Sequence, residues 1–204
     1  MGRTAAYLLT LLAGGCAALA VYGCLLPWRR RRLRRAGLVS PPLREGAVAL
    51  FWMFCGGMAA LTLTPRWVVW SLVDLLHGYT WNTWNTGGDP FFELGTVSLV
   101  PFRTFAADAH SLYILAGNVV MFLPFGFFAA LLWRGYTWRR ALVTGLCVTG
   151  AVECWQLLVG RAFDIDDLML NTLGVLAGFG LLRLLEHGAP RVPGRFRVRK
   201  LQEK

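Results

Sequence analysis

Residues 111–133 read SLYILAGNVVMFLPFGFFAALLW, a run of 23 residues without an acidic or basic side chain. A helix of about 20 mostly apolar residues is long enough to cross the hydrocarbon core of a bilayer. Four other stretches have this length and character, and the five predicted spans are Thr4–Leu26, Gly46–Thr64, Ser111–Trp133, Arg140–Val159 and Leu168–Leu185. We therefore expect an all-α, polytopic integral membrane bundle of about five transmembrane helices.

The composition of the chain also favours a lipid bilayer as its surroundings. Of the 204 residues, 56% are hydrophobic and 16% are charged, whereas soluble domains average about 45–50% and about 25%. The net charge of +10 does not indicate nucleic-acid binding, because the basic residues flank the apolar runs and none lies in an RNA- or DNA-binding motif. The five cysteines lie in apolar stretches without metal-ligand spacing, so we expect no metal and no other cofactor.

The distribution of basic residues predicts the orientation of the spans. The first span is directly followed by Arg29–Arg32, Arg34 and Arg35, a cluster that resists translocation, so we interpret the span as a retained anchor rather than a cleaved signal. With this cluster in the cytoplasm, 17 of the 21 basic residues fall on the cytoplasmic side and four outside. The positive-inside rule therefore predicts an outer N-terminus and a cytoplasmic C-terminus.

These patterns divide the chain into four regions. They are an N-terminal membrane anchor helix (1–27), an Arg-rich cytoplasmic linker (28–45), a membrane domain (46–186) and a basic cytoplasmic tail (187–204). The tail contains Pro190 and Pro193, and we expect it to be mobile and attracted to anionic headgroups.

Strongly polar residues inside three predicted spans fall at one depth. Counting from the outer ends at about 1.5 Å per residue, Asn118, Glu153, Gln156 and Asn171 lie about 5–11 Å below the outer boundary. Glu153 and Gln156 share a helix face, as do Asp167 and Asn171, because their spacings are three and four residues. An ionisable group inside a span is costly and usually functional, so this layer is the candidate site.

Each candidate residue has a functional role that its chemistry suggests. Glu153 can transfer or share a proton, and Asp164 and Asp167 can orient it or a cation; these three are the catalytic candidates. Arg103 and Arg161, both on the outer side, are expected to pair with Glu153 or with phosphate and carboxylate groups. The further ligand-binding candidates hold groups by hydrogen bonds, and they are Asn118, Gln156, Asp166 and Asn171.

A purely structural interpretation stands beside the functional one. Asp164 and Asp166 precede a span, where aspartate commonly caps a helix. Asn118, Gln156 and Asn171 can join helices by hydrogen bonds. Pro124 and three glycines are expected to kink or closely pack the helices, namely Gly126, Gly174 and Gly178.

Four sequence elements resemble the VanZ-like family of bacterial membrane proteins, which is named for a teicoplanin-resistance protein. They occur in family order as Leu99-Val-Pro-Phe102, Asn118 to Pro124-Phe-Gly126, Glu153-Cys-Trp-Gln156, and Arg161-x-x-Asp-x-x-Asp167 continuing to Asn171 and Gly174. The similarity extends from about residue 46 to residue 180. It implies a small multi-helix protein of the bacterial cell membrane with a link to the cell envelope and, for the founding member, lowered susceptibility to teicoplanin.

The resemblance supplies no catalytic residue, so three classes of function stay open. The protein is an enzyme acting on an envelope lipid or glycan-linked molecule, a protein that binds or transports such a molecule or another small molecule, or a structural membrane protein whose polar layer only packs helices. For the first two classes we expect an anionic lipid or cell-wall-linked ligand at the outer leaflet.

Overall fold

The computed structural model describes residues 3–65, 68, 94–102 and 110–200. It confirms the predicted membrane bundle, because five helices are long and apolar enough to cross a bilayer. They are α1 (Arg3–Arg35), α2 (Pro42–Leu63), α4 (His110–Leu132), α5 (Trp138–Leu158) and α6 (Ile165–Gly188). The remaining described elements are the short helix α7 (Arg191–Gly194) and the two-residue strands β1 (Leu38–Val39), β2 (Val97–Ser98), β3 (Phe163–Asp164) and β4 (Arg199–Lys200).

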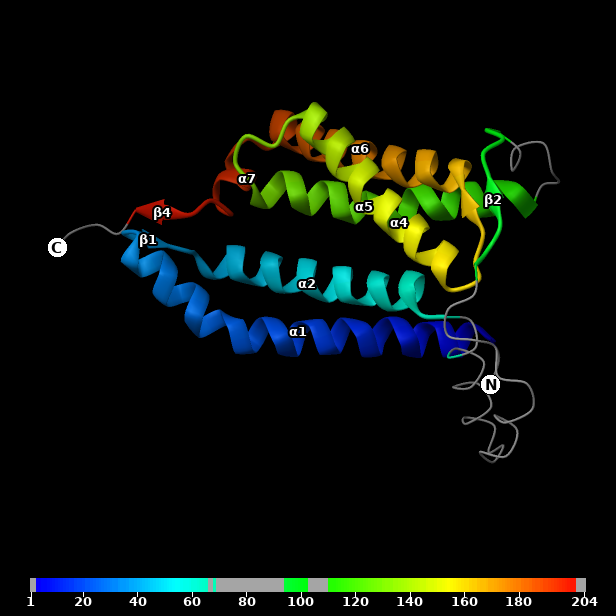
Figure 1. The fold of residues 1–204 in the computed structure, drawn as a ribbon. Coiled ribbons are helices and arrows are strands. Elements are labelled where there is room, and N and C mark those ends of the chain that lie inside the picture. The colour runs from blue at the N-terminus through cyan, green and yellow to red at the C-terminus, as the bar shows by residue number, and fades with distance from the viewer. Residues whose placement is uncertain (1–2, 66–67, 69–93, 103–109, 201–204) are drawn as a thin grey trace, which may run out of the picture.

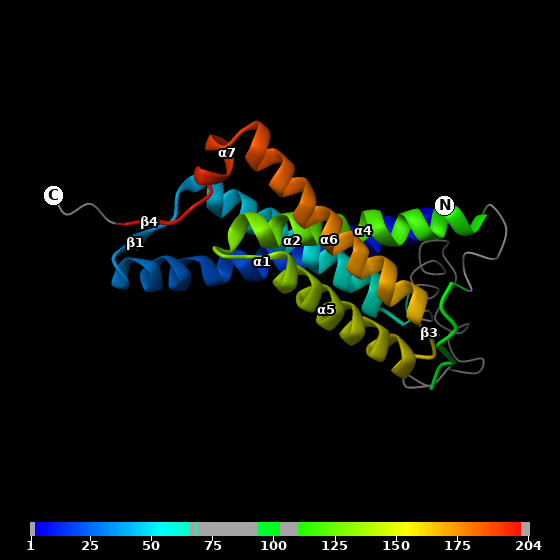
Figure 2. The ribbon, with the colours of Figure 1, turned by 90° about the horizontal axis from the view of Figure 1, so that it is seen from above.

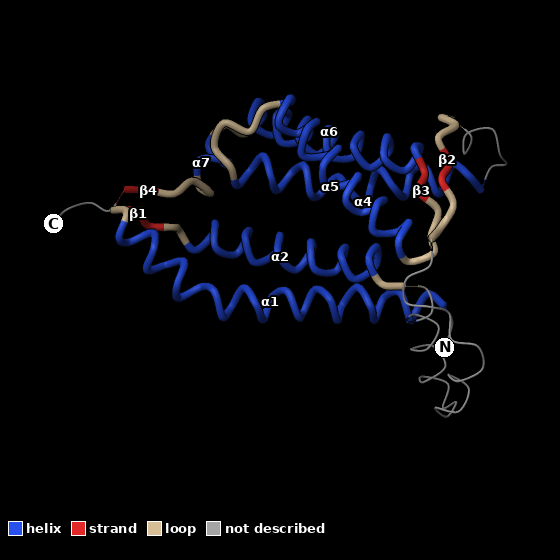
Figure 3. The backbone as a smooth tube through the Cα atoms, in the orientation of Figure 1, coloured by secondary structure: helices blue, strands red, loops and turns tan. Residues whose placement is uncertain are grey.

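The five long helices form two groups that share one axis (Figure 1). The first group is the antiparallel pair α1 and α2, and the second contains α4, α5 and α6, with α6 packed on both of the others. Contacts of α2 with α4 and α5 join the groups (Figure 2). Strands β2 and β3 lie at one end of the bundle, called here the acidic end, and β1 and β4 lie at the opposite, arginine-rich end (Figure 3).

Helix α1 is longer than the span predicted from the apolar run. Its 33 residues correspond to about 50 Å, against a hydrocarbon core of about 30 Å. The helix continues through the arginine cluster to Arg35, so the first part of the predicted linker is helical. Pro27 lies inside α1 and removes one backbone hydrogen bond, and the helix bends toward its C-terminal end (Figure 1).

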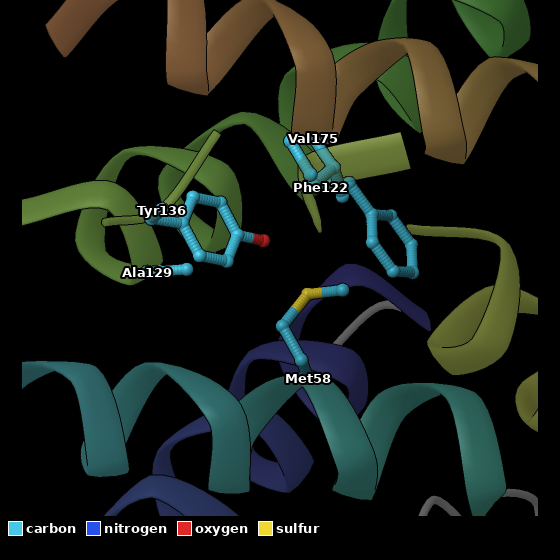
Figure 4. Packing of buried hydrophobic residues seen from close by; sticks show 6 residues of the cluster. Met58, Phe122, Ala129, Tyr136 and Val175 are labelled. Carbon is cyan, nitrogen blue, oxygen red and sulfur yellow. The ribbon is translucent and has the colours of Figure 1, made fainter. Parts of the chain in front are cut away.

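A core of apolar side chains joins the two groups. Met58 reaches from α2 toward Phe122 and Ala129 of α4, Val175 of α6 and Tyr136 of the turn between α4 and α5 (Figure 4). Val175 is fully buried and the other labelled residues are almost so. Burial raises the pKa of Tyr136 above its usual value, so this side chain stays a neutral phenol at physiological pH.

Glycines set the distance between α4 and α6, as the sequence predicted. A Cβ atom at any of three positions would overlap a backbone carbonyl of the facing helix: Gly126 meets Val175, Gly174 meets Val119, and Gly178 meets Leu123. Small residues allow such close approach of membrane helices, where backbone contact replaces side-chain packing. The seam between α1 and α2 is built in the same way around Gly14 and Gly56.

A buried polar cluster fixes α1 to α2 toward the arginine-rich end. The carboxylate of Glu45, on the first turn of α2, accepts hydrogen bonds from the Tyr22 hydroxyl and from Nη1 of Arg29, both at 2.5 Å. The Glu45 side chain is 10% exposed and that of Arg29 25%. A charge at this degree of burial needs a partner, and the pair supplies it.

The expectation of a mobile tail is wrong for residues 189–200. Strand β4 pairs with β1 in antiparallel register, with Leu38 opposite Lys200. Phe196 packs against an apolar cluster that includes Phe51 and Leu132, and Nη1 of Arg44 donates to the Phe196 carbonyl at 3.0 Å. The apolar Phe196 and the backbone pairing anchor this segment despite its basic composition.

Candidate functional site

The N-terminus of α6 is built by Asp164 and a short strand pair. Asp164 is the N-cap residue, and its Oδ1 accepts the backbone N–H of Asp166 at 2.9 Å. Just before it, β3 pairs in parallel with β2, so that Phe163 lies opposite Val97. Capping by an aspartate satisfies a free N–H and complements the helix dipole. Asp164 therefore has the structural role that the sequence allowed for it.

Glu153 of α5 faces the start of α6 rather than lipid. Its side chain is 1% exposed, and Oε2 accepts the backbone N–H of Asp164 at 3.1 Å. An ionised carboxylate has about four acceptor positions, so this one bond leaves capacity for a proton or a further donor.

Asp166 holds the segment that precedes α4 in the sequence. Its side chain is 1% exposed, and Oδ1 accepts the backbone N–H of Phe102 at 2.6 Å. Phe102 has a φ angle of 65°, a left-handed conformation that residues other than glycine seldom adopt. The carboxylate stabilises this unusual backbone, so Asp166 has a positioning role at the site.

Asp167 and Asn171 lie on the face of α6 that the sequence predicted. Asp167 is half-buried, and its Oδ1 accepts a hydrogen bond from the Asn118 amide, which links α6 to α4. Asn171 lies one turn further along and is 4% exposed. Within the described part of the chain its Oδ1 is buried without a hydrogen-bond partner, and such a group is costly unless a donor reaches it.

Gln156 and Arg161 bind the C-terminal end of α2. The Gln156 amide and Nη1 of Arg161 both donate to the carbonyl oxygen of Thr62 at 3.2 Å. The indole N–H of Trp155 donates to the Leu63 carbonyl at 2.7 Å. The last carbonyls of a helix lack partners within the helix and carry a partial negative charge. The three donors therefore give these carbonyls hydrogen-bond partners, and the positive charge of Arg161 offsets the partial charge.

An apolar cavity of about 420 Å³ adjoins this polar layer. It lies between α2, α4 and α5, and Met58, Phe122 and Val148 are among its lining residues. Its wall also includes Thr62 and Trp155, which both take part in the hydrogen bonds at the C-terminal end of α2. Ligand pockets usually have volumes of about 300–1,000 Å³, so this cavity is large enough for part of a small molecule or of an acyl chain.

Eight of the nine residues singled out from the sequence lie in the described structure, and all eight gather at the acidic end. Arg103 lies outside the described residues. Arg161 donates to the Thr62 carbonyl and Glu153 accepts the Asp164 N–H, and a pairing of Arg161 with Glu153 stays a prediction. In the described ranges no group of three His, Cys, Asp or Glu side chains is placed to hold a metal ion.

Three contributors to the site were not identified from the sequence. Thr62 accepts hydrogen bonds at its carbonyl oxygen, and Phe102 donates its backbone N–H to Asp166. Trp155 stands between Glu153 and Gln156 and carries an N–H that needs an acceptor when buried. Backbone groups are the same at every position, so the sequence could not single out the Thr62 carbonyl or the Phe102 N–H. The Trp155 indole was the one side chain whose need for an acceptor could have been noticed.

Comparison with protein-family models identifies the family of this chain. A search of curated proteins and a search of solved structures each gave no match. The family model VanZ/LLP1 matches residues 51–186, two thirds of the chain. The matched range includes most of α2, all of α4 and α5, and α6 up to residue 186, with every residue of the candidate site. The chain is therefore a member of the VanZ/LLP1 family of proteins, with a multi-pass membrane fold.

Proposed function

We propose that the acidic end binds an amphiphilic molecule of the cell envelope, an anionic lipid or a glycan-linked lipid, from the outer leaflet of a bacterial cell membrane. The observation that carries the proposal is that the apolar cavity is continuous with the polar layer of the acidic end. The apolar cavity shares Thr62 and Trp155 with the polar contacts around Gln156 and Arg161. An amphiphile needs such a junction, with an apolar slot for its chain beside polar groups for its head.

The polar layer suits a head that carries both hydroxyl and acidic groups. The oxygens of Glu153 and Asp167 can accept hydrogen bonds from sugar hydroxyls, and Asn171 has a buried acceptor without a partner in the described structure. Arg161 is half-buried and bonded to Thr62 in the cavity wall, and its guanidinium can attract a phosphate or a carboxylate. Glu153 is the group best placed to exchange a proton with a bound molecule, in an enzyme or a binding protein alike.

Lowered susceptibility to glycopeptides such as teicoplanin is the phenotype that we propose to follow from this binding. These antibiotics act at the cell envelope, and a protein that occupies or alters one of its lipid-linked components changes their target. The phenotype provides a readout in cells that does not require the ligand to be known.

The first experiment measures teicoplanin susceptibility of a sensitive Gram-positive host that expresses the wild-type protein, Glu153→Gln or Asp167→Asn at matched membrane levels. We expect wild type to protect and both variants to lose most of that protection. Cys154→Ala is the matched control, since Cys154 is the next residue of α5 and is exposed on the outside of the bundle.

Each alternative function gives a different result. If the Glu153 and Asp167 variants protect as well as wild type, the polar layer only packs helices and the proposal is wrong. If wild type itself does not protect, native mass spectrometry of the purified protein with extracted envelope lipids tests binding directly. Turnover of a bound lipid that disappears in Glu153→Gln while the fold survives would identify an enzyme, and binding without turnover a binding or transport protein.

A further inference from the structure

A second cavity, of about 350 Å³, lies at the arginine-rich end of the bundle, far from the candidate site. The C-terminal segment closes it against the bundle, so its walls come from parts of the chain that are distant in sequence. Four arginines line it, each from a different segment: Arg44 from α2, Arg134 from the turn after α4, Arg183 from α6, and Arg197 from the stretch between α7 and β4.

Among the described residues that line this cavity, positive charge exceeds negative charge. Glu186 is the only acidic residue among the lining residues, and its Oε2 already pairs with Nη1 of Arg183 at 2.5 Å. Within the described ranges the side chains of Arg134 and Arg197 have no hydrogen-bond or ion-pair partner. Like charges that converge on one cavity repel each other unless an anion lies between them.

Arg44 has a buried hydrogen-bond donor that lacks an acceptor among the described residues. Its Nη1 donates to the Phe196 carbonyl at 3.0 Å, which fixes the guanidinium in place. Its Nε is buried and has no acceptor within the described part of the chain. A buried donor without an acceptor is rare and calls for a missing partner, and a guanidinium seeks an acidic one.

We propose that this cavity binds a phosphate group, carried either by the headgroup of an anionic lipid or by a soluble phosphate ester. Guanidinium groups form paired, charge-assisted hydrogen bonds with phosphate, and several together suit its tetrahedral oxygens. Basic pockets between membrane helices on the cytoplasmic side bind anionic headgroups in this way. Bound phosphate would fasten the C-terminal segment to α2 and α6.

The test uses the purified full-length protein and two double variants of equal charge. The cavity variant, Arg134→Gln with Arg197→Gln, removes two exposed arginines that line the cavity. The tail control, Arg191→Gln with Arg195→Gln, removes two exposed arginines of the C-terminal segment that do not line it. Since all four side chains are exposed, both variants are expected to fold, which size-exclusion chromatography and circular dichroism check.

Native mass spectrometry compares binding of phosphatidylglycerol with that of zwitterionic phosphatidylcholine of the same acyl chains. We expect wild type and the tail control to prefer phosphatidylglycerol. The cavity variant should bind it about tenfold more weakly, as expected for losing charge-assisted hydrogen bonds. In a second arm, glycerol phosphate is added and thermal unfolding is followed.

The two arms separate the sources of the phosphate. Preference for phosphatidylglycerol that only the cavity variant loses supports a lipid headgroup. Stabilisation by glycerol phosphate that only the cavity variant loses supports a soluble ester. Equal losses in both double variants would show general attraction to a basic tail. The absence in wild type of both a preference for phosphatidylglycerol and stabilisation by glycerol phosphate would show that no anion site exists. Either result overturns the proposal.

Discussion

At the scale of single residues, the carboxylates of the acidic end are joined by hydrogen bonds into a chain. Glu153 accepts from the Asp164 backbone, Asp164 from the Asp166 backbone, and Asp166 from the Phe102 backbone. Each carboxylate thereby fixes the backbone of the next residue in the series. This explains how several acids can gather in a small volume, because every carboxylate has a donor to stabilise it.

Asp166 is expected to be the most sensitive of these residues to truncation. Asp166→Ala leaves the Phe102 N–H without its acceptor and releases a strained backbone, so the free energy of unfolding should fall by about 1–3 kcal/mol. Asp164→Ser keeps a capping oxygen and should change it by less than about 0.5 kcal/mol. Thermal unfolding in detergent measures both, and an equal loss in the two variants would contradict the positioning role of Asp166.

That the polar residues lie near one end of the helices could be predicted from the sequence, but their partners could not. A rise of 1.5 Å per residue places Glu153 and Asn171 in one layer however the helices rotate. Which group each one bonds depends on that rotation and on the loops. Glu153 accepts a backbone N–H that the sequence did not predict, because the turn from α5 into α6 brings Asp164 beside it.

At the scale of elements, the contact between α4 and α6 depends on positions where no side chain fits. Gly174 and Gly178 lie one turn apart on α6, and each faces a carbonyl of α4. Asn171 lies on the same side of α6 and Asn118 lies on α4, so the distance between the two helices also sets the geometry of the polar layer.

Gly178→Ala is therefore expected to destabilise the protein, because its Cβ would push α6 away from the Leu123 carbonyl. Overpacking of this kind costs typically about 1–3 kcal/mol. Gly180→Ala is the control, since nothing lies within 4 Å of its new Cβ and alanine favours helix over glycine by about 1 kcal/mol. Thermal unfolding should move in opposite directions for the two variants; a loss in both would refute the packing argument.

The existence of all five helices followed from hydropathy, whereas their ends did not. Six of the seven residues 29–35 are arginines, and an apolar scale stops the first span before them. The helix continues because arginine is a good helix former and only the hydrocarbon core, not the helix itself, requires apolar residues. Strands of two residues, such as β2 and β3, have no periodicity from which to be predicted.

At the scale of the whole molecule, the chain separates its charges between two ends. The acids of the candidate site lie at the end with β2 and β3. Arg44, Arg134, Arg183 and Arg197 line the cavity that Leu38 of β1 also lines, at the other end. Because the number of long helices in the described chain is odd, its first and last described residues lie at opposite ends of the bundle (Figure 1). The positive-inside rule then predicts that the arginine-rich end faces the cytoplasm.

Reporter fusions test this orientation. A fluorescent protein that folds only in the cytoplasm should be bright when fused after Arg35 or after Lys200, and dark when fused after Leu63. A phosphatase that is active only outside should give the reverse pattern at the same three positions. Bright fluorescence after Leu63 would mean that the bundle is inverted, and the candidate site would then face the cytoplasm.

The pairing of β1 with β4 has a consequence for biosynthesis. Strand β1 leaves the ribosome before four of the five spans are made, and β4 follows all of them. The two strands can therefore meet only after α6 has been inserted, since chains fold from the N-terminus as they are synthesised. Until then β1 has an unpaired edge, and Arg44 lacks the Phe196 carbonyl that accepts its hydrogen bond. The strand pair thus marks a chain whose membrane insertion is complete.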